Sequence, residues 1–197
     1  MQDTLLEDRP LKDATLIEKS EIELLSRFPY LQERDTSRTN HPDPSQRYTQ
    51  SVNTSQLPYR LYRFMVPPTK LPSRNIAFAG AMYSLGSFPL AYLQSLWIAA
   101  YFDDKIDLPS VENAREEAYT NSQYCILRNA MGYGRVAPDI VFDNLPYFDV
   151  LLRDMGIEGR RKGGGLGELW KSYGPEDYRG LVEEVVAKRK VEDKKNI

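Results

Sequence analysis

The segment from Gly80 to Pro89 contains several small residues, which can let a backbone approach a flat cofactor closely; they are Gly80, Ala81, Ser84, Gly86 and Ser87. The segment follows an apolar run at residues 76–79 and leads directly into a helix-forming segment. In open α/β sheets, a strand that ends in a small residue and turns into a helix brings the chain near a ring or a phosphate. The helix dipole would stabilise negative charge there. A turn of small residues that serves packing alone has the same sequence, so both interpretations stay open at this point.

A second candidate is the glycine run at residues 163–167, which follows Arg160, Arg161 and Lys162. The exposed backbone N–H groups of glycines, next to cationic side chains, can bind a phosphate group. However, no predicted strand precedes the run, and no Gly-Lys-Ser or Gly-Lys-Thr follows it. The sequence therefore favours an exposed hinge between helices over a phosphate-binding loop.

Other residues with chemical potential give no catalytic assignment. Carboxylates occur as neighbours at 103–104, 116–117 and 183–184, and adjacent residues of a helix point in different directions. The chain has one cysteine, Cys125, and one histidine, His41, which lies in a polar stretch. This composition excludes a disulfide framework and the usual zinc site. We predict no metal site, and the catalytic residues stay unknown.

Composition limits the class of protein and its partners. The 197-residue chain has 41% hydrophobic residues, a formal net charge of −2 and a pI near 5.6. This charge gives no attraction to nucleic acid or to an anionic membrane. No run reaches the roughly 18 to 20 apolar residues of a membrane span. Since the first residues are polar and acidic, they do not resemble a signal peptide, and we expect a cytoplasmic protein.

Helical segments are predicted at five places. Apolar residues at helical spacing favour a short amphipathic helix over 15–27. A helix from Phe88 to Phe102 is apolar nearly all round, which predicts burial on most sides. Further helices are expected over 111–129, over 145–155 with a stop at Gly156, and from Pro175 onward.

Two strands are predicted at residues 59–66 and 75–81. Both are rich in aromatic and aliphatic residues, and the intervening segment contains three prolines. An antiparallel hairpin with a loose loop is the simplest connection between them. The chain offers hardly any other strand, so a complete sheet is not expected.

Several stretches together resemble the C-terminal part of flavin-containing monooxygenases, in particular fungal and bacterial FMO-like proteins, also called dimethylaniline-monooxygenase-like. These stretches read ELLSRFPYL, PYRLYRFMVPP, RNIAFAGA, LQSLWIAAYF and, further on, PYFDVLLRDMGIEGRRKGGGLGELWKSYGPEDYRGLVEE. The resemblance covers most of residues 13–185 and is spread over many positions. It implies a fungal FAD- and NADPH-dependent enzyme.

The resemblance also implies positions for the cofactor. In such enzymes the strand returns to the FAD-binding domain and the next helix starts beside the flavin ring. The matching positions here are Gly80, Ala81, Ser87, Pro89 and Gln94. The implied chemistry is reduction of FAD by NADPH, reaction with oxygen, and transfer of one oxygen atom to a small-molecule substrate.

Three parts follow from this resemblance: a helix and long polar loop at 1–56, a terminal hairpin and flavin-side helix at 57–108, and a C-terminal helical extension at 109–197. The expected fold class is α+β, mainly helical, with an incomplete Rossmann-type fold. No Gly-x-Gly-x-x-Gly fingerprint follows a strand, whereas the resembled enzymes carry two.

We therefore expect a C-terminal fragment or truncated member of an FAD-dependent monooxygenase, with a role in specialised metabolism, and leave open whether this chain alone is an enzyme. One alternative is a non-catalytic helical interaction module, and another is one half of a split flavoenzyme. Apolar surface around residues 76–102 would then serve a protein partner or self-association.

Overall fold

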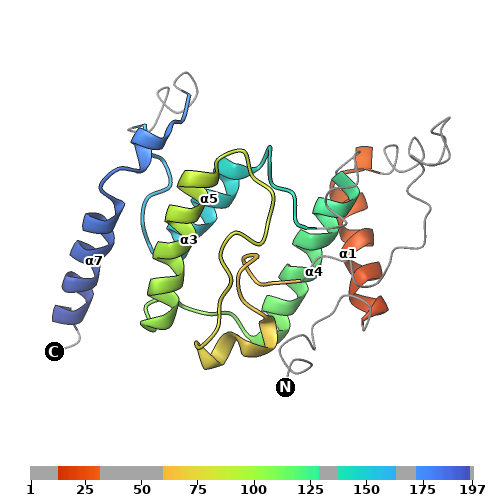
Figure 1. Ribbon diagram of the computed structural model, residues 1–197. Helices are drawn as coiled ribbons and strands as arrows, with labels where there is room; N and C mark the ends of the chain where they lie inside the picture. Colours follow the sequence, from red (N-terminus) through yellow and green to blue (C-terminus); the bar gives the residue numbers. More distant parts are fainter. Residues whose placement is uncertain (1–12, 32–59, 129–136, 163–171, 196–197) are drawn as a thin grey trace. The chain divides into compact units, whose positions relative to one another are not determined.

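The computed structural model describes residues 13–31, 60–128, 137–162 and 172–195 (Figure 1). Its contacts divide the chain into two compact units. The first comprises Met1–Tyr83 and Leu108–Ile140, and the second comprises Ser84–Asp107 and Val141–Ile197. Each unit thus combines two separate stretches of the sequence. The predicted three-part division stays a prediction, and the polar stretch at 32–56 lies outside the described residues.

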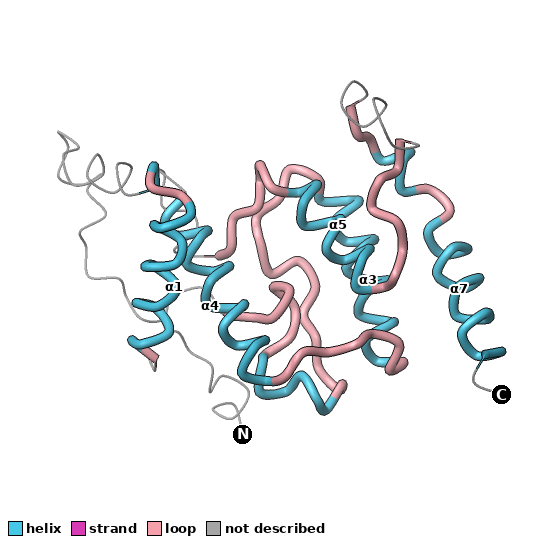
Figure 2. Tube along the Cα trace, turned by 180° about the vertical axis from the view of Figure 1, so that it is seen from behind, coloured by secondary structure: helices cyan, strands magenta, loops and turns pink. Residues whose placement is uncertain are grey.

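The first unit is built on two long helices, α1 (Ala14–Arg27) and α4 (Val111–Arg128), and a short 3₁₀ helix, η5 (Pro68–Ser73). α1 begins after Asp13, whose carboxylate accepts a hydrogen bond of 3.2 Å from the backbone N–H of Leu16. α1 and α4 lie side by side in both views (Figures 1 and 2). The helices predicted over 15–27 and 111–129 are therefore confirmed.

The second unit contains α3 (Ser87–Phe102), α5 (Asn144–Asp154), the 3₁₀ helix η7 (Pro175–Tyr178) and α7 (Leu181–Lys195). α5 stops before Gly156, which has a φ of +65° that suits glycine. The single helix predicted from Pro175 is two helices, because the chain turns at Arg179 and Gly180. Gly180 has a φ of +77°, which does not continue a right-handed helix.

α3 packs one face into the core of the second unit, but the predicted burial on most sides is wrong. The buried residues are Leu90, Leu93, Gln94, Trp97, Ala100 and Tyr101, whereas Ser87, Phe88, Ala91, Ser95, Ala99 and Phe102 are exposed. α3 packs against α5, and the two helices lie side by side in Figures 1 and 2. Trp97 is fully buried and stacks on Tyr101 with ring centroids 5.4 Å apart. The indole Nε1 of Trp97 donates a 2.9 Å hydrogen bond to Asp154 at the end of α5. The buried side chains opposite come from α5 and include Phe148, Leu151 and Leu152.

The two predicted strands are wrong for the residues that the structure describes. No strand forms in 60–66 or in 75–81; residue 59 is not described. Instead the chain reverses within residues 62–66, where the backbones of Tyr62 and Val66 exchange hydrogen bonds of 2.7 and 3.0 Å. One hydrogen bond of 2.8 Å, from Phe78 N–H to the Met65 carbonyl, joins the two segments. The mainly helical part of the expected fold is confirmed, and the hairpin of long strands is not.

The reversal has a local cause and tertiary support. Arg63 and Phe64 both adopt left-handed backbone angles, with φ of 51° and 56°. Each such residue costs roughly 1–2 kcal/mol when it is not glycine. Phe64 is buried, and the guanidinium of Arg63 forms an ion pair with Glu117 of α4. These contacts compensate for the strain, so an aromatic-rich run becomes a turn.

In the described part of the chain, no helix has both the length and the apolar character needed to cross a lipid bilayer.

Candidate functional site

Gly80, one of the positions predicted to border the flavin, has a left-handed backbone. It lies in the first unit, is exposed and has a φ of +71°. A Cβ built at this position meets no atom within 4 Å, so the backbone is open to an approaching group. The next residue, Ala81, is half-buried. A larger side chain at Gly80 would be strained by its φ, and it would also cover this open surface.

The turn that leads into α3 is fixed by polar contacts within the second unit. The hydroxyl of Ser84 donates a 2.7 Å hydrogen bond to the Asn144 side chain and accepts one of 3.0 Å from the N–H of Gly86. Ser87 is the first residue of α3 and is exposed, whereas Pro89 is half-buried in the first turn. Proline suits this turn because its missing N–H is not needed there.

Gln94 has a structural role in this molecule. Its side chain is fully buried, and its Nε2 donates a 2.9 Å hydrogen bond to the hydroxyl of Tyr147 on α5. The pair thus joins α3 to α5. A contact between Gln94 and a flavin stays a prediction.

The described residues do not make a complete FAD site. Gly80 and Ala81 belong to the first unit, whereas Ser87, Pro89 and Gln94 belong to the second. Within the described ranges there is no glycine-rich loop that opens a helix after a strand and could hold a diphosphate. The backbone at Gly80 is open, and its contact with a flavin stays a prediction.

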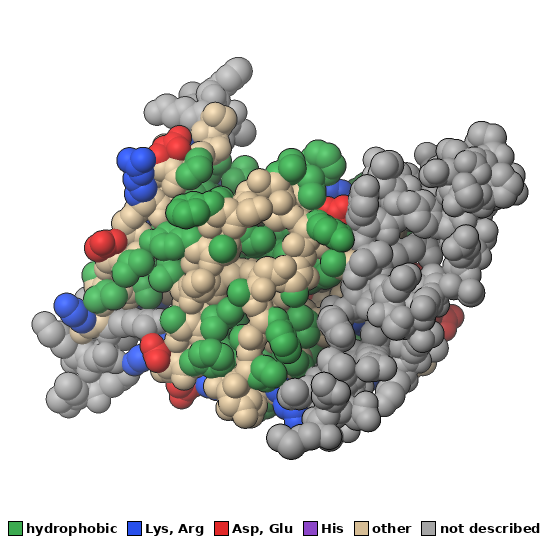
Figure 3. Space-filling view, viewed as in Figure 1, with side chains coloured by type: hydrophobic (Ala, Val, Ile, Leu, Met, Phe, Trp, Pro, Cys, Tyr) green, Lys and Arg blue, Asp and Glu red, His purple; other side chains and the backbone are tan. Residues whose placement is uncertain are grey.

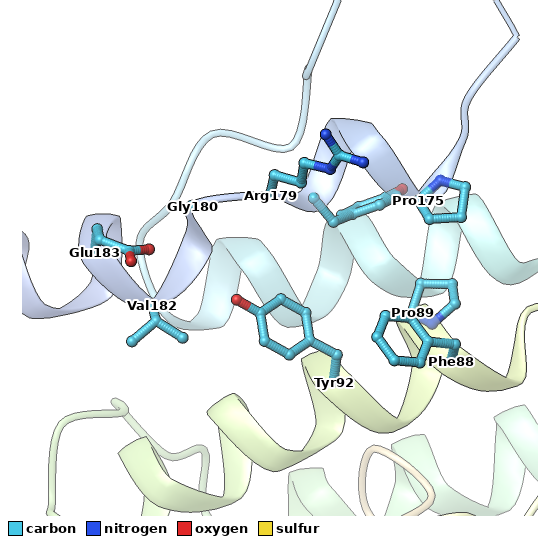
Figure 4. Close-up of a pocket in the computed structure, with 9 residues that line it drawn as sticks. Phe88, Pro89, Tyr92, Pro175, Arg179, Gly180, Val182 and Glu183 are labelled. Atoms are coloured by element: carbon cyan, nitrogen blue, oxygen red, sulfur yellow. The ribbon is translucent and has the colours of Figure 1, made fainter.

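A groove that the sequence did not predict lies in the second unit, between the start of α3 and the η7–α7 segment. The hollow that reaches α7, which we call the main cavity, has a volume of about 300 Å³. Figure 4 shows Phe88 and Tyr92 on α3 and, on the other side, Pro175 and Val182. The remaining lining residues are Pro89, Tyr178, Arg179, Gly180 and Glu183.

A neighbouring hollow of about 410 Å³ shares Phe88, Pro89, Pro175 and Tyr178 with the main cavity. It adds the exposed side chains of Leu85 and Leu145. We call the two hollows together the α3–η7 groove. Figure 3 shows hydrophobic side chains gathered around α3. Sequence reasoning missed the groove because one wall comes from a segment far along the chain.

The wall formed by η7 and α7 is held by charged side chains from the loop after α5. Arg161 makes two hydrogen bonds to the Glu184 carboxylate, of 2.9 and 2.6 Å, and its Nε donates to the Asp177 carbonyl at 3.0 Å. Lys162 pairs with the Asp177 carboxylate at 2.6 Å. These two cations, taken from the sequence as candidates for phosphate binding, therefore have carboxylate partners. The glycine run beyond them, 163–167, lies outside the described residues.

These contacts shift the pKa values of both carboxyl groups. The hydrogen bond from Lys162 holds the pKa of Asp177 below its ordinary value of 3.8. The hydrogen bonds from Arg161 hold the pKa of Glu184 below its ordinary value of 4.5. Both groups are therefore ionised at neutral pH, as the ion pairs require.

The first unit contains a buried cation that no pattern in the sequence predicts. The Arg60 side chain is 3% exposed, and burial lowers its pKa to about 10. Its guanidinium donates to the Tyr119 carbonyl at 3.2 Å and to the Gln123 side chain at 3.1 Å. It also lies 4.5 Å from the centre of the Tyr119 ring. Arg60 thus anchors the turn at 61–66 to α4.

Comparison with known proteins gives matches of one kind. The chain is 39% identical over 143 residues to the FAD-dependent monooxygenase rstn6 of Aspergillus nomiae. The aligned region covers 71% of this chain and 24% of that protein. It is 39% identical over 139 residues to the FAD-dependent monooxygenase resA of Aspergillus sclerotiorum, with 68% and 24% covered. An Arabidopsis thaliana protein named "Probable flavin-containing monooxygenase 1" is 29% identical over 124 residues, and the match covers 63% of this chain and 22% of that protein.

No family model and no solved structure matches the chain. The chain spans about a quarter of the length of the fungal relatives that it matches. The resemblance predicted from the sequence is confirmed, because these matches cover about 70% of the chain. The chain is a homologue of FAD-dependent monooxygenases, most of them fungal.

Proposed function

We propose that this chain contributes the flavin-bordering part of an FAD-dependent monooxygenase that oxygenates a small molecule. The observation that carries the proposal is the 39% identity to two fungal FAD-dependent monooxygenases over most of the chain. Bound FAD would supply the oxygen-transfer chemistry, with NADPH as the reductant. A substrate from specialised metabolism is part of this proposal.

The roles of this chain's own residues are orientation and packing. Gly80 would let the edge of the ring approach the backbone, because a Cβ there has open space and no side chain intervenes. Ser84 and Asn144 would keep the start of α3 fixed, since they join it to α5 at 2.7 Å. Gln94 would help to hold α3 in position through its hydrogen bond to Tyr147 on α5. Each is a positioning role in this proposal.

The test is a titration of the full chain with FAD, followed by the visible absorption of the flavin. We expect saturable but weak binding with a perturbed flavin band, because the described residues would border the ring without a cradle for the diphosphate. Gly80→Val should weaken FAD binding about tenfold or more, because it both strains and covers the open backbone. Gly180→Val controls for backbone strain alone, because it places the same side chain at a similar φ, +77° against +71°, in the α3–η7 groove and not at Gly80. Equal effects of both changes, or no binding to the unchanged chain, would contradict the proposal.

A non-catalytic interaction module is the second candidate. The exposed apolar side chains of Leu85, Phe88 and Leu145 favour it, because they lie together along the α3–η7 groove. One half of a split flavoenzyme would have the same exposed surface. A chain that binds no FAD but sediments as a stable oligomer would favour the interaction module. A chain that acquires FAD only in a mixture with a separately encoded flavoprotein half would favour the split enzyme.

A further inference from the structure

We propose that the α3–η7 groove binds an uncharged, planar aromatic small molecule. The proposal does not rest on flavin chemistry, since the groove lies in the second unit and Gly80 lies in the first. Ligand pockets in proteins typically have volumes of about 300 to 1,000 Å³. The main cavity, at about 300 Å³, is at the small end of this range. An α-helix with side chains is about 10 Å wide, so a small molecule suits the cavity better than a partner helix.

The lining favours a flat aromatic ligand. Phe88 and Tyr92 come from α3, and Tyr178 comes from η7, so aromatic rings stand on both sides of the cavity. Tyr178 is held in place by edge-to-face packing on Phe148, with ring centroids 5.5 Å apart. Pro89 and Pro175 add rigid apolar surface. Aromatic and proline side chains of this kind bind a planar ring favourably by stacking, and they lose little conformational entropy on binding.

The polar groups of the groove favour a ligand without net charge. Arg179 and Glu183 both line the main cavity, and their opposite charges offset one another. The Tyr92 hydroxyl is the neutral polar group on the α3 side. A ring with one hydroxyl or amine could use it for orientation, as in pockets where a few polar groups set specificity.

The second wall is held in place before any ligand binds. Arg161 and Lys162 bind Glu184 and Asp177, so η7 and the first turn of α7 are fixed by contacts outside the cavity. Preformed walls reduce the cost of ordering on binding. A wall that is ordered before binding is typical of a ligand pocket and not of a flexible surface patch.

The experiment uses the full chain and the neutral fluorescent probe N-phenyl-1-naphthylamine, which is a planar aromatic amine. We expect a saturable rise in probe fluorescence with one site per chain. Phe88→Ala should weaken binding about tenfold. The matched control is Phe142→Ala in the same unit, because Phe142 is 82% exposed and Phe88 is 77% exposed, yet only Phe88 lines the groove. The control should change the dissociation constant by less than about twofold.

Three results would overturn the proposal. Equal losses in the two variants would show that the probe coats exposed apolar surface in general. Absence of saturation would show that no site exists. Sedimentation of the unchanged chain as a dimer that Phe88→Ala alone dissociates would show that a second copy occupies the groove. Because Phe88 and Phe142 are both exposed, circular dichroism should be unchanged in both variants, and the titration is run with and without FAD. If the chain binds the probe but not FAD, the proposed function fails while this inference stands.

Discussion

The side-chain amide of Gln94 donates a 2.9 Å hydrogen bond to the hydroxyl of Tyr147, and this buried pair links α3 to α5. Both side chains lie inside the core of the second unit. The stability lost by mutating such a hydrogen bond depends on whether one partner or both are removed. When only one is removed, the other polar group stays buried without either its partner or water.

The first prediction concerns this pair. Gln94→Leu or Tyr147→Phe alone should lower the free energy of unfolding by about 1–3 kcal/mol, because each leaves a polar partner buried. The double variant should cost clearly less than the sum of the single changes. Urea unfolding, followed by the fluorescence of Trp97 and Trp170, measures the three variants. Additive losses would mean that the two side chains do not depend on one another.

The second prediction concerns pH and the wall of the groove. The pKa values of Asp177 and Glu184 are lowered in the folded chain, from ordinary values of 3.8 and 4.5. The folded state therefore favours their ionised forms, and the stabilisation is complete above about pH 5. It is lost as the pH falls through the ordinary values and below the lowered ones. We expect the amides of α7 to lose protection from hydrogen exchange in this acidic range.

The variant Arg161→Gln should produce the same loss of α7 protection already at neutral pH, because it removes the partner of Glu184. Glu183→Gln is the control, since Arg161 pairs with Glu184 and not with its neighbour. Exchange rates corrected for the intrinsic effect of pH give the measurement. An α7 that stays equally protected in Arg161→Gln would mean that apolar packing holds this wall.

The third prediction concerns Cys125. Burial raises the pKa of its thiol to about 12, so the reactive thiolate is nearly absent at neutral pH. We expect the native chain to react with a disulfide reagent such as DTNB far more slowly than the urea-unfolded chain does. A thiol that reacts at the same rate in both states would show that α4 opens readily around Cys125.

The fourth prediction concerns Arg60, whose planar guanidinium contacts both Tyr119 and Gln123. Arg60→Lys should lower the free energy of unfolding by about 1.5–3 kcal/mol, because an ammonium cannot make both hydrogen bonds and stack on the ring. Arg60→Met should cost less, since it also removes the buried charge. Urea midpoints compare the two. A lysine variant as stable as the unchanged chain would mean that water reaches this position.

The sequence alone was sufficient for most of the helices. α1, α3, α4 and α5 were predicted within a few residues, because apolar periodicity, Pro89 in the first turn of α3 and the stop at Gly156 are local signals. The break at Gly180 was missed. Glycine in a helical pattern is ambiguous until its φ is known, and here that φ is +77°.

The strand predicted at 59–66 failed for a different reason. Aromatic and β-branched residues are common in strands because they pack well on a half-buried sheet. They do not by themselves force the backbone to be extended. In the structure these side chains are buried around a turn, and the ion pair of Arg63 with Glu117 supports the left-handed backbone. A contact between residues so far apart in the chain leaves no local signal in the sequence.

The sequence by itself determined the kinship with FAD-dependent monooxygenases and the positions of the main helices, because both are recorded in residue patterns that can be compared one position at a time. Only the tertiary structure decided that Gln94 packs against Tyr147, and that Phe88 faces Pro175 across a groove. The physical reason is the same in both cases. Burial and cavity shape depend on which distant segments pack together, and residue types alone do not specify that choice.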